Sequence, residues 1–125
     1  MKAEMMQQIK LFDWIRTQLN IAPYAFSIPN EGKRSPLLGK LMKRMGMRSG
    51  VSDIFIAIPV YFENEFFHGL FIEMKANGKS GKCGKATPNQ LEFHKDMKLQ
   101  GYYCAVCDSA EAAIFLITQY LKNQS

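Results

Sequence analysis

Residues 53–75 have the sequence DIFIAIPVYFENEFFHGLFIEMK, which contains the two most hydrophobic predicted strands of the chain. Two segments in it, 53–61 and 66–74, are rich in β-branched and aromatic residues, and a short polar stretch separates them. Segments of this kind on either side of a polar turn predict an antiparallel hairpin. If the chain turns at residues 63–64, the numbers of opposed residues sum to about 126–128. This register brings Asp53 opposite the end of the second segment.

The rest of the chain alternates between the two periodicities of regular secondary structure. Apolar residues at three- and four-residue spacing predict helices, and compact runs of β-branched and aromatic residues predict strands. Thr87-Pro88-x-Gln90 has the form of a helix start, and Asp108 or Ser109 can cap a final helix. The predicted order is α-β-α-β-β-α-β-α, with helices over 2–19, 37–45, 87–99 and 109–121 and strands over 24–28, 53–61, 66–74 and 102–107.

Composition bounds the class of protein. The chain has 125 residues, of which 47% are hydrophobic, so we expect a single domain over 1–125 with a sizeable core. The sequence contains no apolar run long enough for a membrane span, and residues 1–10 carry charged and amide side chains where a signal peptide would be apolar. We therefore expect a soluble cytoplasmic protein with no membrane partner.

Positive charge gathers in two parts of the sequence. Sixteen Lys and Arg against eleven Asp and Glu give a net charge of +5, and the basic residues concentrate at 33–48 and 75–85. Such clustering suggests a polyanionic partner, nucleic acid before membrane, although a solvated surface is the alternative. Gly78-Lys79-Ser80 lacks the upstream glycine of a P-loop, so no nucleotide cofactor is predicted.

The three cysteines are interpreted as core residues. An odd number cannot complete a disulfide framework, which fits a reducing compartment. Cys104 and Cys107 form a C-x-x-C, but their odd separation points them to opposite faces of the predicted strand. A zinc or redox site would need the two thiols to converge, so neither is predicted.

The hairpin also carries the candidate chemistry. Glu73 and Lys75 are two residues apart and share a strand face, and the predicted register adds Asp53 opposite them. Buried charges are costly unless they are paired or bind a metal. Two carboxylates, the backbone carbonyl of Met74 and water suit Mg²⁺. The alternative is that Lys75 simply pairs with Glu73 or Asp53 at a strand end.

Several of these segments together resemble the VRR-NUC family of the PD-(D/E)xK nuclease superfamily. The resemblance covers nearly the whole chain, and it implies a restriction-endonuclease-like α/β fold with an αβββαβ core and a mixed central sheet flanked by helices. Ser52 stands where the superfamily name expects proline, at a position that shapes the backbone. The matching segments are Pro29-Asn30-Glu31-Gly32-Lys33-Arg34, Gly50-Val51-Ser52-Asp53-Ile54-Phe55, Phe71-Ile72-Glu73-Met74-Lys75, Thr87-Pro88-Asn89-Gln90 and Gly101-Tyr102.

The resemblance implies roles for individual residues. Asp53 and Glu73 would bind Mg²⁺ or Mn²⁺, which would lower the pKa of a bound water and neutralise charge on the scissile phosphate. Lys75 would position the attacking water or stabilise charge on the phosphate. We favour the electrostatic role, because two neighbouring carboxylates keep a lysine charged. Gln90 would face the site, or it would only complete a capping box. Glu31 would be an outer metal ligand, or a turn residue.

The implied substrate is DNA. Lys33, Arg34, Lys79, Lys82 and Lys85 are the residues that we expect to contact its backbone, although the Gly- and Lys-rich loop around the last three can equally be a solvated loop. His94 follows Gln90 by one helical turn, and we interpret it as a surface histidine.

The resemblance extends to stand-alone viral or mobile-element proteins, and small basic members of the superfamily act as dimeric resolvases of branched DNA. It therefore implies a homodimeric endonuclease that selects flaps or four-way junctions. Methionine-rich faces in the first two predicted helices suit such an interface, although both helices can equally pack only on the sheet. The alternative function is a non-catalytic nucleic-acid-binding or assembly module that keeps the nuclease fold.

Overall fold

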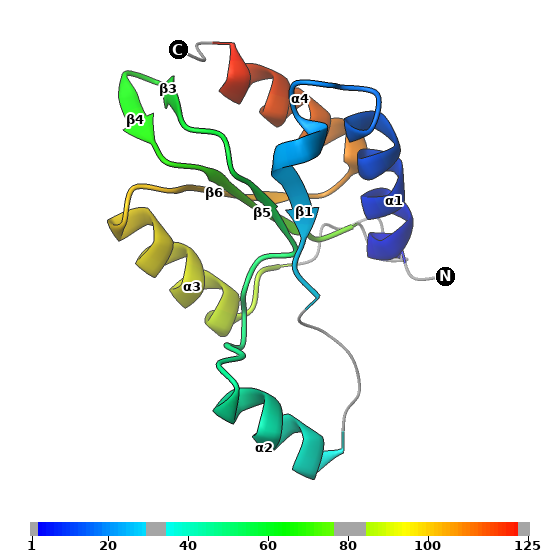
Figure 1. The fold of residues 1–125 in the computed structure, drawn as a ribbon, viewed down its shortest axis with the longest axis vertical. Helices are drawn as coiled ribbons and strands as arrows, with labels where there is room; N and C mark the ends of the chain where they lie inside the picture. Colours follow the sequence, from blue (N-terminus) through cyan, green and yellow to red (C-terminus); the bar gives the residue numbers. More distant parts are fainter. Residues whose placement is uncertain (1–2, 30–34, 77–84, 123–125) are drawn as a thin grey trace.

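The computed structural model describes residues 3–29, 35–76 and 85–122, and it has a mixed four-stranded sheet between helical layers (Figure 1). The strand order is β1-β2-β5-β6. Helices α1 and α4 cover one face of the sheet and α3 covers the other. The elements are α1 (Ala3–Ile15), a 3-10 turn η1 (Ala22–Tyr24), β1 (Ala25–Ser27), α2 (Pro36–Arg44), β2 (Ile54–Ile56), β3 (Val60–Phe62), β4 (Glu65–Phe67), β5 (Leu70–Met74), α3 (Pro88–Leu99), β6 (Tyr103–Cys107) and α4 (Ala110–Leu121).

The predicted register of the hairpin is confirmed. Strands β2 and β5 are antiparallel, and Ile54 pairs with Ile72, so the paired numbers sum to 126. Strand β1 adds to β2 in antiparallel fashion, and β6 adds to β5 in parallel after the α3 crossover. The sheet is therefore mixed, as expected for the αβββαβ core.

The hairpin is not one continuous ladder, contrary to the prediction. Its outer part, β3 and β4, forms a separate two-stranded sheet in which Val60 pairs with Phe67, so the paired numbers sum to 127. Between the β2–β5 ladder and the β3–β4 ladder, one side of the hairpin therefore has three residues, 57–59, and the other side has two, 68–69. Pro59 lies in the longer side, and it has no backbone N–H for a ladder bond, which explains why pairing is interrupted there.

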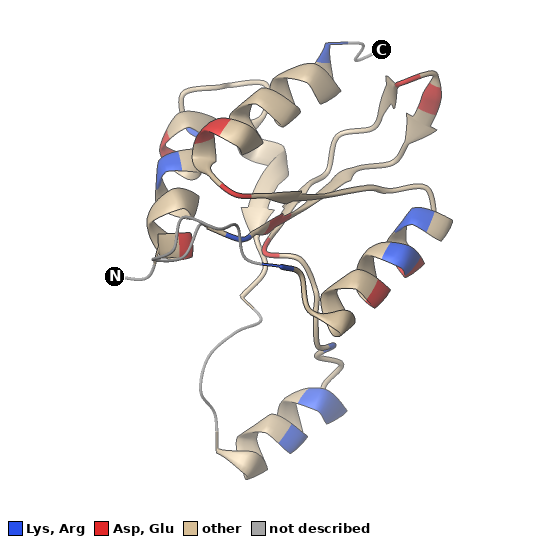
Figure 2. Cartoon of the chain, turned by 180° about the vertical axis from the view of Figure 1, so that it is seen from behind, with Lys and Arg blue, Asp and Glu red and all other residues tan. Residues whose placement is uncertain are grey.

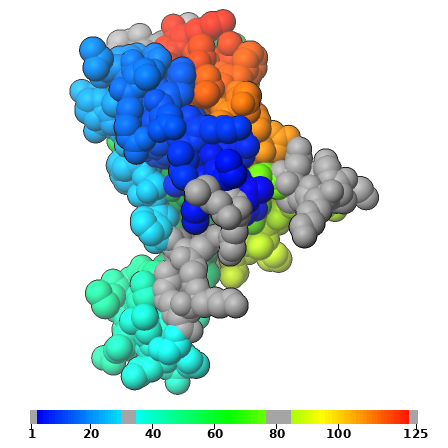
Figure 3. Space-filling model, turned by 90° about the vertical axis from the view of Figure 1, so that its right-hand side faces the viewer, coloured from blue at the N-terminus to red at the C-terminus, as the bar shows by residue number. Residues whose placement is uncertain are grey.

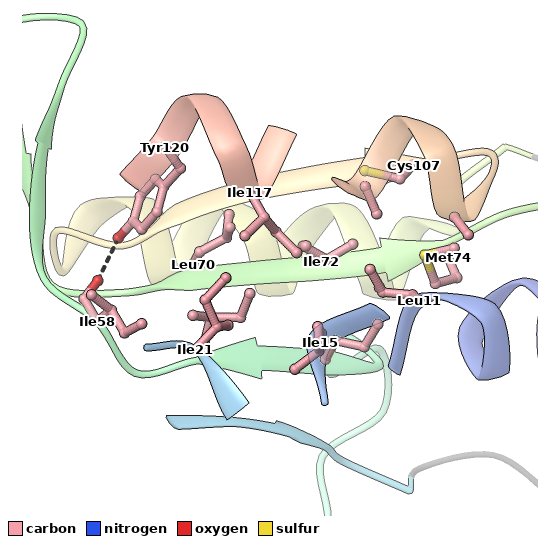
Figure 4. Packing of buried hydrophobic residues seen from close by; sticks show 14 of the residues in the cluster. Leu11, Ile15, Ile21, Ile58, Leu70, Ile72, Met74, Cys107, Ile117 and Tyr120 are labelled. Atoms are coloured by element: carbon pink, nitrogen blue, oxygen red, sulfur yellow. Dashed lines mark hydrogen bonds between the residues drawn. The ribbon is translucent and has the colours of Figure 1, made fainter. Parts of the chain in front are cut away.

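Alternate residues of the strands serve different faces of the sheet. Even-numbered residues of β2 and β5, such as Ile54 and Ile72, pack with α1 and α4 in the main core. Figure 4 shows this core, in which Tyr120 donates a hydrogen bond from its hydroxyl to the Ile58 carbonyl at 2.9 Å. Odd-numbered residues such as Phe71 pack instead against α3. The two faces are therefore separate environments.

The cysteines of β6 follow the same division. Cys107 packs in the main core and Cys104 packs on the α3 side, so the two thiols lie on opposite faces as predicted. Both are buried and free, and burial raises the pKa of each thiol to about 11. They are protonated core residues, and nothing in their placement joins them in a redox or metal pair.

Helix boundaries follow from side-chain caps. The capping box of α3 is present, because the Thr87 hydroxyl accepts the Gln90 N–H and the Gln90 side-chain oxygen accepts the Thr87 N–H. Ser109, rather than Asp108, caps α4. Helix α1 ends at Ile15, earlier than predicted, since the Thr17 hydroxyl bonds to the Trp14 carbonyl and competes with helical bonding.

Helix α2 stands apart from the main body. Figure 3 shows it as a separate lobe, and none of its residues is buried. Its apolar side is left exposed, with Leu37 68% and Met45 85% accessible. By their spacing, Lys40 and Lys43 lie on the other side of the helix, whereas Arg44 lies beside Leu37 at the edge of the apolar side. None of the helices in the described ranges is long and apolar enough to cross a membrane.

Candidate functional site

The predicted residues Asp53, Glu73 and Lys75 meet where β5 ends. Asp53 directly precedes β2, and its Oδ2 accepts a hydrogen bond from the Met74 N–H at 2.8 Å. Lys75 directly follows β5, and its N–H donates to the Cys107 carbonyl at 2.8 Å, so the β5–β6 ladder continues through it. Since strand residues alternate, positions 73 and 75 lie on the α3 side, together with Phe71. Figure 2 shows acidic and basic segments close together in this central region.

Burial makes the carboxylate of Glu73 exceptional. Its side chain is only 1% exposed, whereas Asp53 and Lys75 are half-buried. A carboxylate at this depth is costly to keep charged unless a cation or hydrogen-bond donors compensate it. Glu73 thus lies deep in the fold, while Asp53 and Lys75, beside it in the β2–β5 register, lie nearer the surface.

The donor set fits a hard divalent cation. Within the described residues, no three His, Cys, Asp or Glu side chains gather as metal ligands, so a closed tetrahedral zinc site has no support there. Two carboxylates with a backbone carbonyl and water are instead the kind of set that Mg²⁺ accepts, because it retains several waters. Asp53 and Glu73 are the side chains that could hold such an ion.

A cavity of about 260 Å³ adjoins this site. It is bounded by Lys75 after β5, by Gln90 at the start of α3 and by Lys43 of α2. Gln90 is buried, and its side-chain oxygen belongs to the capping box, yet the residue also lines the space beside Lys75. The two predicted roles of Gln90 are thus not exclusive. The cavity brings two lysines and the N-terminus of a helix to one opening, which suits an anionic ligand.

Gly50 allows the loop before Asp53 to approach α3. Its φ is +87°, and a Cβ atom built there would lie 2.4 Å from the backbone carbon of Asn89. A larger residue would be strained by its backbone conformation and would also push the loop off the first turn of the helix. This glycine therefore sets the distance between the loop and the wall of the cavity.

His94 corrects the prediction of a surface histidine. It is 6% exposed, and its Nε2 lies 2.7 Å from the Oγ of Ser52, which is fully buried. Burial lowers the pKa of His94 below its ordinary value of 6.5, and the charge of Lys98 lowers it further. Gln90, Phe93 and His94 lie at three- and four-residue spacing, so the helical period could have indicated a buried face.

The predicted DNA contacts are only partly within the described ranges. Lys33, Arg34, Lys79 and Lys82 lie outside the described residues, as does Glu31, which was expected to be an outer metal ligand, and Lys85 is exposed. Sequence reasoning noted the basic cluster at 33–48 without singling out Lys43, which lines the cavity. Figure 2 shows basic residues along both α2 and α3.

Comparison with known proteins identifies the fold. A solved structure described as a VRR_NUC domain protein matches with a TM-score of 0.82 and 26% sequence identity, covering 100% of this chain and 93% of that one. No protein-family model matches the sequence, and no curated protein matches it. The structural match confirms the resemblance and the fold expected from the sequence motifs. The chain has a nuclease-family fold.

Proposed function

We propose that this chain, which shares its fold over its whole length with a VRR_NUC domain protein, is a Mg²⁺- or Mn²⁺-dependent endonuclease that hydrolyses phosphodiester bonds of DNA. One observation carries the proposal: a nearly fully buried carboxylate, Glu73, lies on the strand next to Asp53, whose own carboxylate is fixed by the Met74 N–H. A purely structural role would not require a buried charge at this position.

Asp53 and Glu73 would hold the divalent cation, with the Met74 carbonyl as a backbone ligand. Glu31, outside the described residues, is proposed as an outer ligand on the strength of the resemblance alone. The bound cation would act as a Lewis acid toward the scissile phosphate and its attacking water. Lys75 would stabilise the charge that develops on the phosphate, since a fixed cation in a partly dry site acts more strongly than one in water. Gln90 would help to position the phosphate from the cavity wall.

DNA would approach along the cavity between α2 and α3. Lys43 and Lys75 face this space, and the N-terminus of α3 adds a partial positive charge. Lys33, Arg34, Lys79, Lys82 and Lys85 would extend the contact to flanking phosphates. These electrostatic contacts would provide affinity without sequence selectivity.

The exposed apolar side of α2 supports a homodimer that acts on branched DNA. Leu37, Leu38, Leu41 and Met45 are all more than 40% exposed, and by their spacing they share one side of the helix, while Lys40 and Lys43 lie on the other. A second copy of the chain that covers this apolar side would leave both basic sides free for DNA. Two active sites related by symmetry are what cutting both strands of a four-way junction requires.

The test is cleavage of labelled DNA, as a linear duplex and as a four-way junction with the same arms. We expect products with Mg²⁺ or Mn²⁺, none with EDTA, and faster cutting of the junction. The Glu73→Gln variant controls for contaminating nucleases. Binding without metal-dependent cleavage would instead assign the chain to the alternative class, a non-catalytic nucleic-acid-binding module. A monomer that cuts both substrates equally would remove the dimer and the preference for junctions.

A further inference from the structure

A buried polar pair lies directly behind the proposed metal ligand Asp53. Ser52, the preceding residue, is 0% exposed, and its Oγ is 2.7 Å from the Nε2 of His94 in the middle of α3. This hydrogen bond joins residues 42 positions apart in the sequence. A serine hydroxyl and an imidazole buried together satisfy each other, whereas either one alone would be left with an unmet polar group.

Ser52, Arg48 and Gly50 each tie the segment before Asp53 to α3. Arg48 forms an ion pair with Asp96 at 2.6 Å, and its guanidinium lies over the ring of Phe93. Gly50 packs against the backbone of Asn89 at the start of the helix. The other two contacts are partly exposed or purely steric, so the Ser52–His94 bond is the buried polar contact closest to Asp53.

Asp53 is held on its other side by the sheet. Its carbonyl accepts the Ile28 N–H at 2.7 Å, and its Oδ2 accepts the Met74 N–H at 2.8 Å. The backbone that enters Asp53 is thus fixed by α3, and the carboxylate is fixed by β5. Loss of the α3 contact would free the backbone on one side of the carboxylate.

A serine beside a histidine could also act as a nucleophile and base, but burial argues against this role. Ser52 has no exposed surface, so a phosphate could not reach its Oγ without an opening of the fold. His94 is only 6% exposed, and its backbone carbonyl accepts a hydrogen bond from the Cys104 thiol. Because the Ser52 hydroxyl is out of reach of a phosphate, the pair acts on the site through Asp53.

We infer that Ser52 and His94 are positioning residues for the metal centre: their buried hydrogen bond holds Asp53 so that its carboxylate faces both Met74 and the cation. That a metal binds here rests on the proposed function, whereas the placement of Asp53 by the Ser52–His94 bond does not depend on it. Ser52 stands where the name PD-(D/E)xK has proline, which would restrict the backbone. In this chain the hydrogen bond from Ser52 to His94 would restrict the backbone instead.

The first readout is hydrogen exchange of the Met74 amide, which reports the Asp53 contact without any metal. We expect exchange about fivefold faster in Ser52→Ala and in His94→Ala than in wild type, after correction for global stability. His94→Gln keeps a donor and acceptor amide for Ser52, so its Met74 exchange should stay within about twofold of wild type. Tyr120→Phe is the matched control, because it removes a buried hydrogen bond far from Asp53 and should change global stability alone.

The second readout is Mn²⁺ affinity of the folded protein, measured by calorimetry without DNA. Ser52→Ala and His94→Ala should each weaken binding about tenfold, the double variant should be no weaker, and Tyr120→Phe should bind normally. Unchanged Met74 exchange in folded Ser52→Ala would overturn the inference, even if His94→Ala fails to fold. Absence of Mn²⁺ binding in wild type would count against the proposed function instead, and Met74 exchange would still decide the positioning role.

Discussion

The two faces of the central sheet use the same strands for different purposes. The even-numbered face is uniformly apolar, with Ile54, Ile56 and Ile72 fully buried beneath α1 and α4. The odd-numbered face is covered by α3, where Phe71 packs among aromatic residues; Glu73 follows on the same face, and Asp53 and Lys75 lie at its end. The apolar face under α1 and α4 stabilises the fold. The face under α3 can therefore hold buried charged groups whose desolvation costs free energy. Substitution of Glu73 in β5 should therefore reduce DNA cleavage, whereas substitution of its neighbour Ile72 should reduce the stability of the fold.

The largest effect is expected from the charges on the odd-numbered face. Glu73→Gln or Lys75→Ala should slow DNA cleavage at least about a hundredfold, because both groups act on charge in the transition state. Asp53→Asn should do the same and also weaken Mn²⁺ binding. Single-turnover cleavage and DNA binding are measured in parallel, and DNA affinity should fall far less than the cleavage rate. Wild-type cleavage rates in Glu73→Gln would remove this face from catalysis.

The neighbouring residue on the even-numbered face should affect stability rather than chemistry. Ile72→Ala removes buried methyl groups from the main core and should lower the free energy of unfolding by about 2–5 kcal/mol. Denaturant unfolding measures this loss, with Glu73→Gln as the comparison. If the glutamine variant were the more destabilised of the two, the division of labour between the faces would be wrong.

Much of this division was predictable from the sequence. Alternation and a turn at residues 63–64 were sufficient to place Asp53 opposite Glu73, because register in a hairpin follows from simple counting. The burial of His94 was missed, although the three- and four-residue spacing of Gln90, Phe93 and His94 does indicate one buried face of α3. The separate position of α2 depends on contacts that periodicity does not describe.

A smaller effect concerns the approach of DNA to the charged face. Neutralising Lys79, Lys82 and Lys85 together should flatten the slope of log affinity against log salt by roughly two to three units, if they contact phosphates. Titration of labelled duplex at several salt concentrations gives the slope. Neutralising Lys2, Lys10 and Lys122 makes a control of equal charge. An equal change in both variants would indicate a general effect of net charge.

The smallest effect should come from the buried histidine of the odd-numbered face. Because burial and Lys98 lower the pKa of His94 in the folded state, the unfolded chain binds a proton there at higher pH. Stability from this group is present above about pH 6.5 and is lost as pH falls below that value. Unfolding free energies between about pH 7.5 and pH 5 measure it. His94→Gln should show a weaker decline, and a decline identical to wild type would mean that His94 is not responsible.

A metal centre on the odd-numbered face can be located in crystals from the anomalous scattering of Mn²⁺. We expect a peak within roughly 2.1 Å of carboxylate oxygens of both Asp53 and Glu73. The peak should be absent in crystals of Asp53→Asn grown under the same conditions. A strong peak elsewhere on the molecule, with none between these two carboxylates, would mean that Asp53 and Glu73 do not hold the cation.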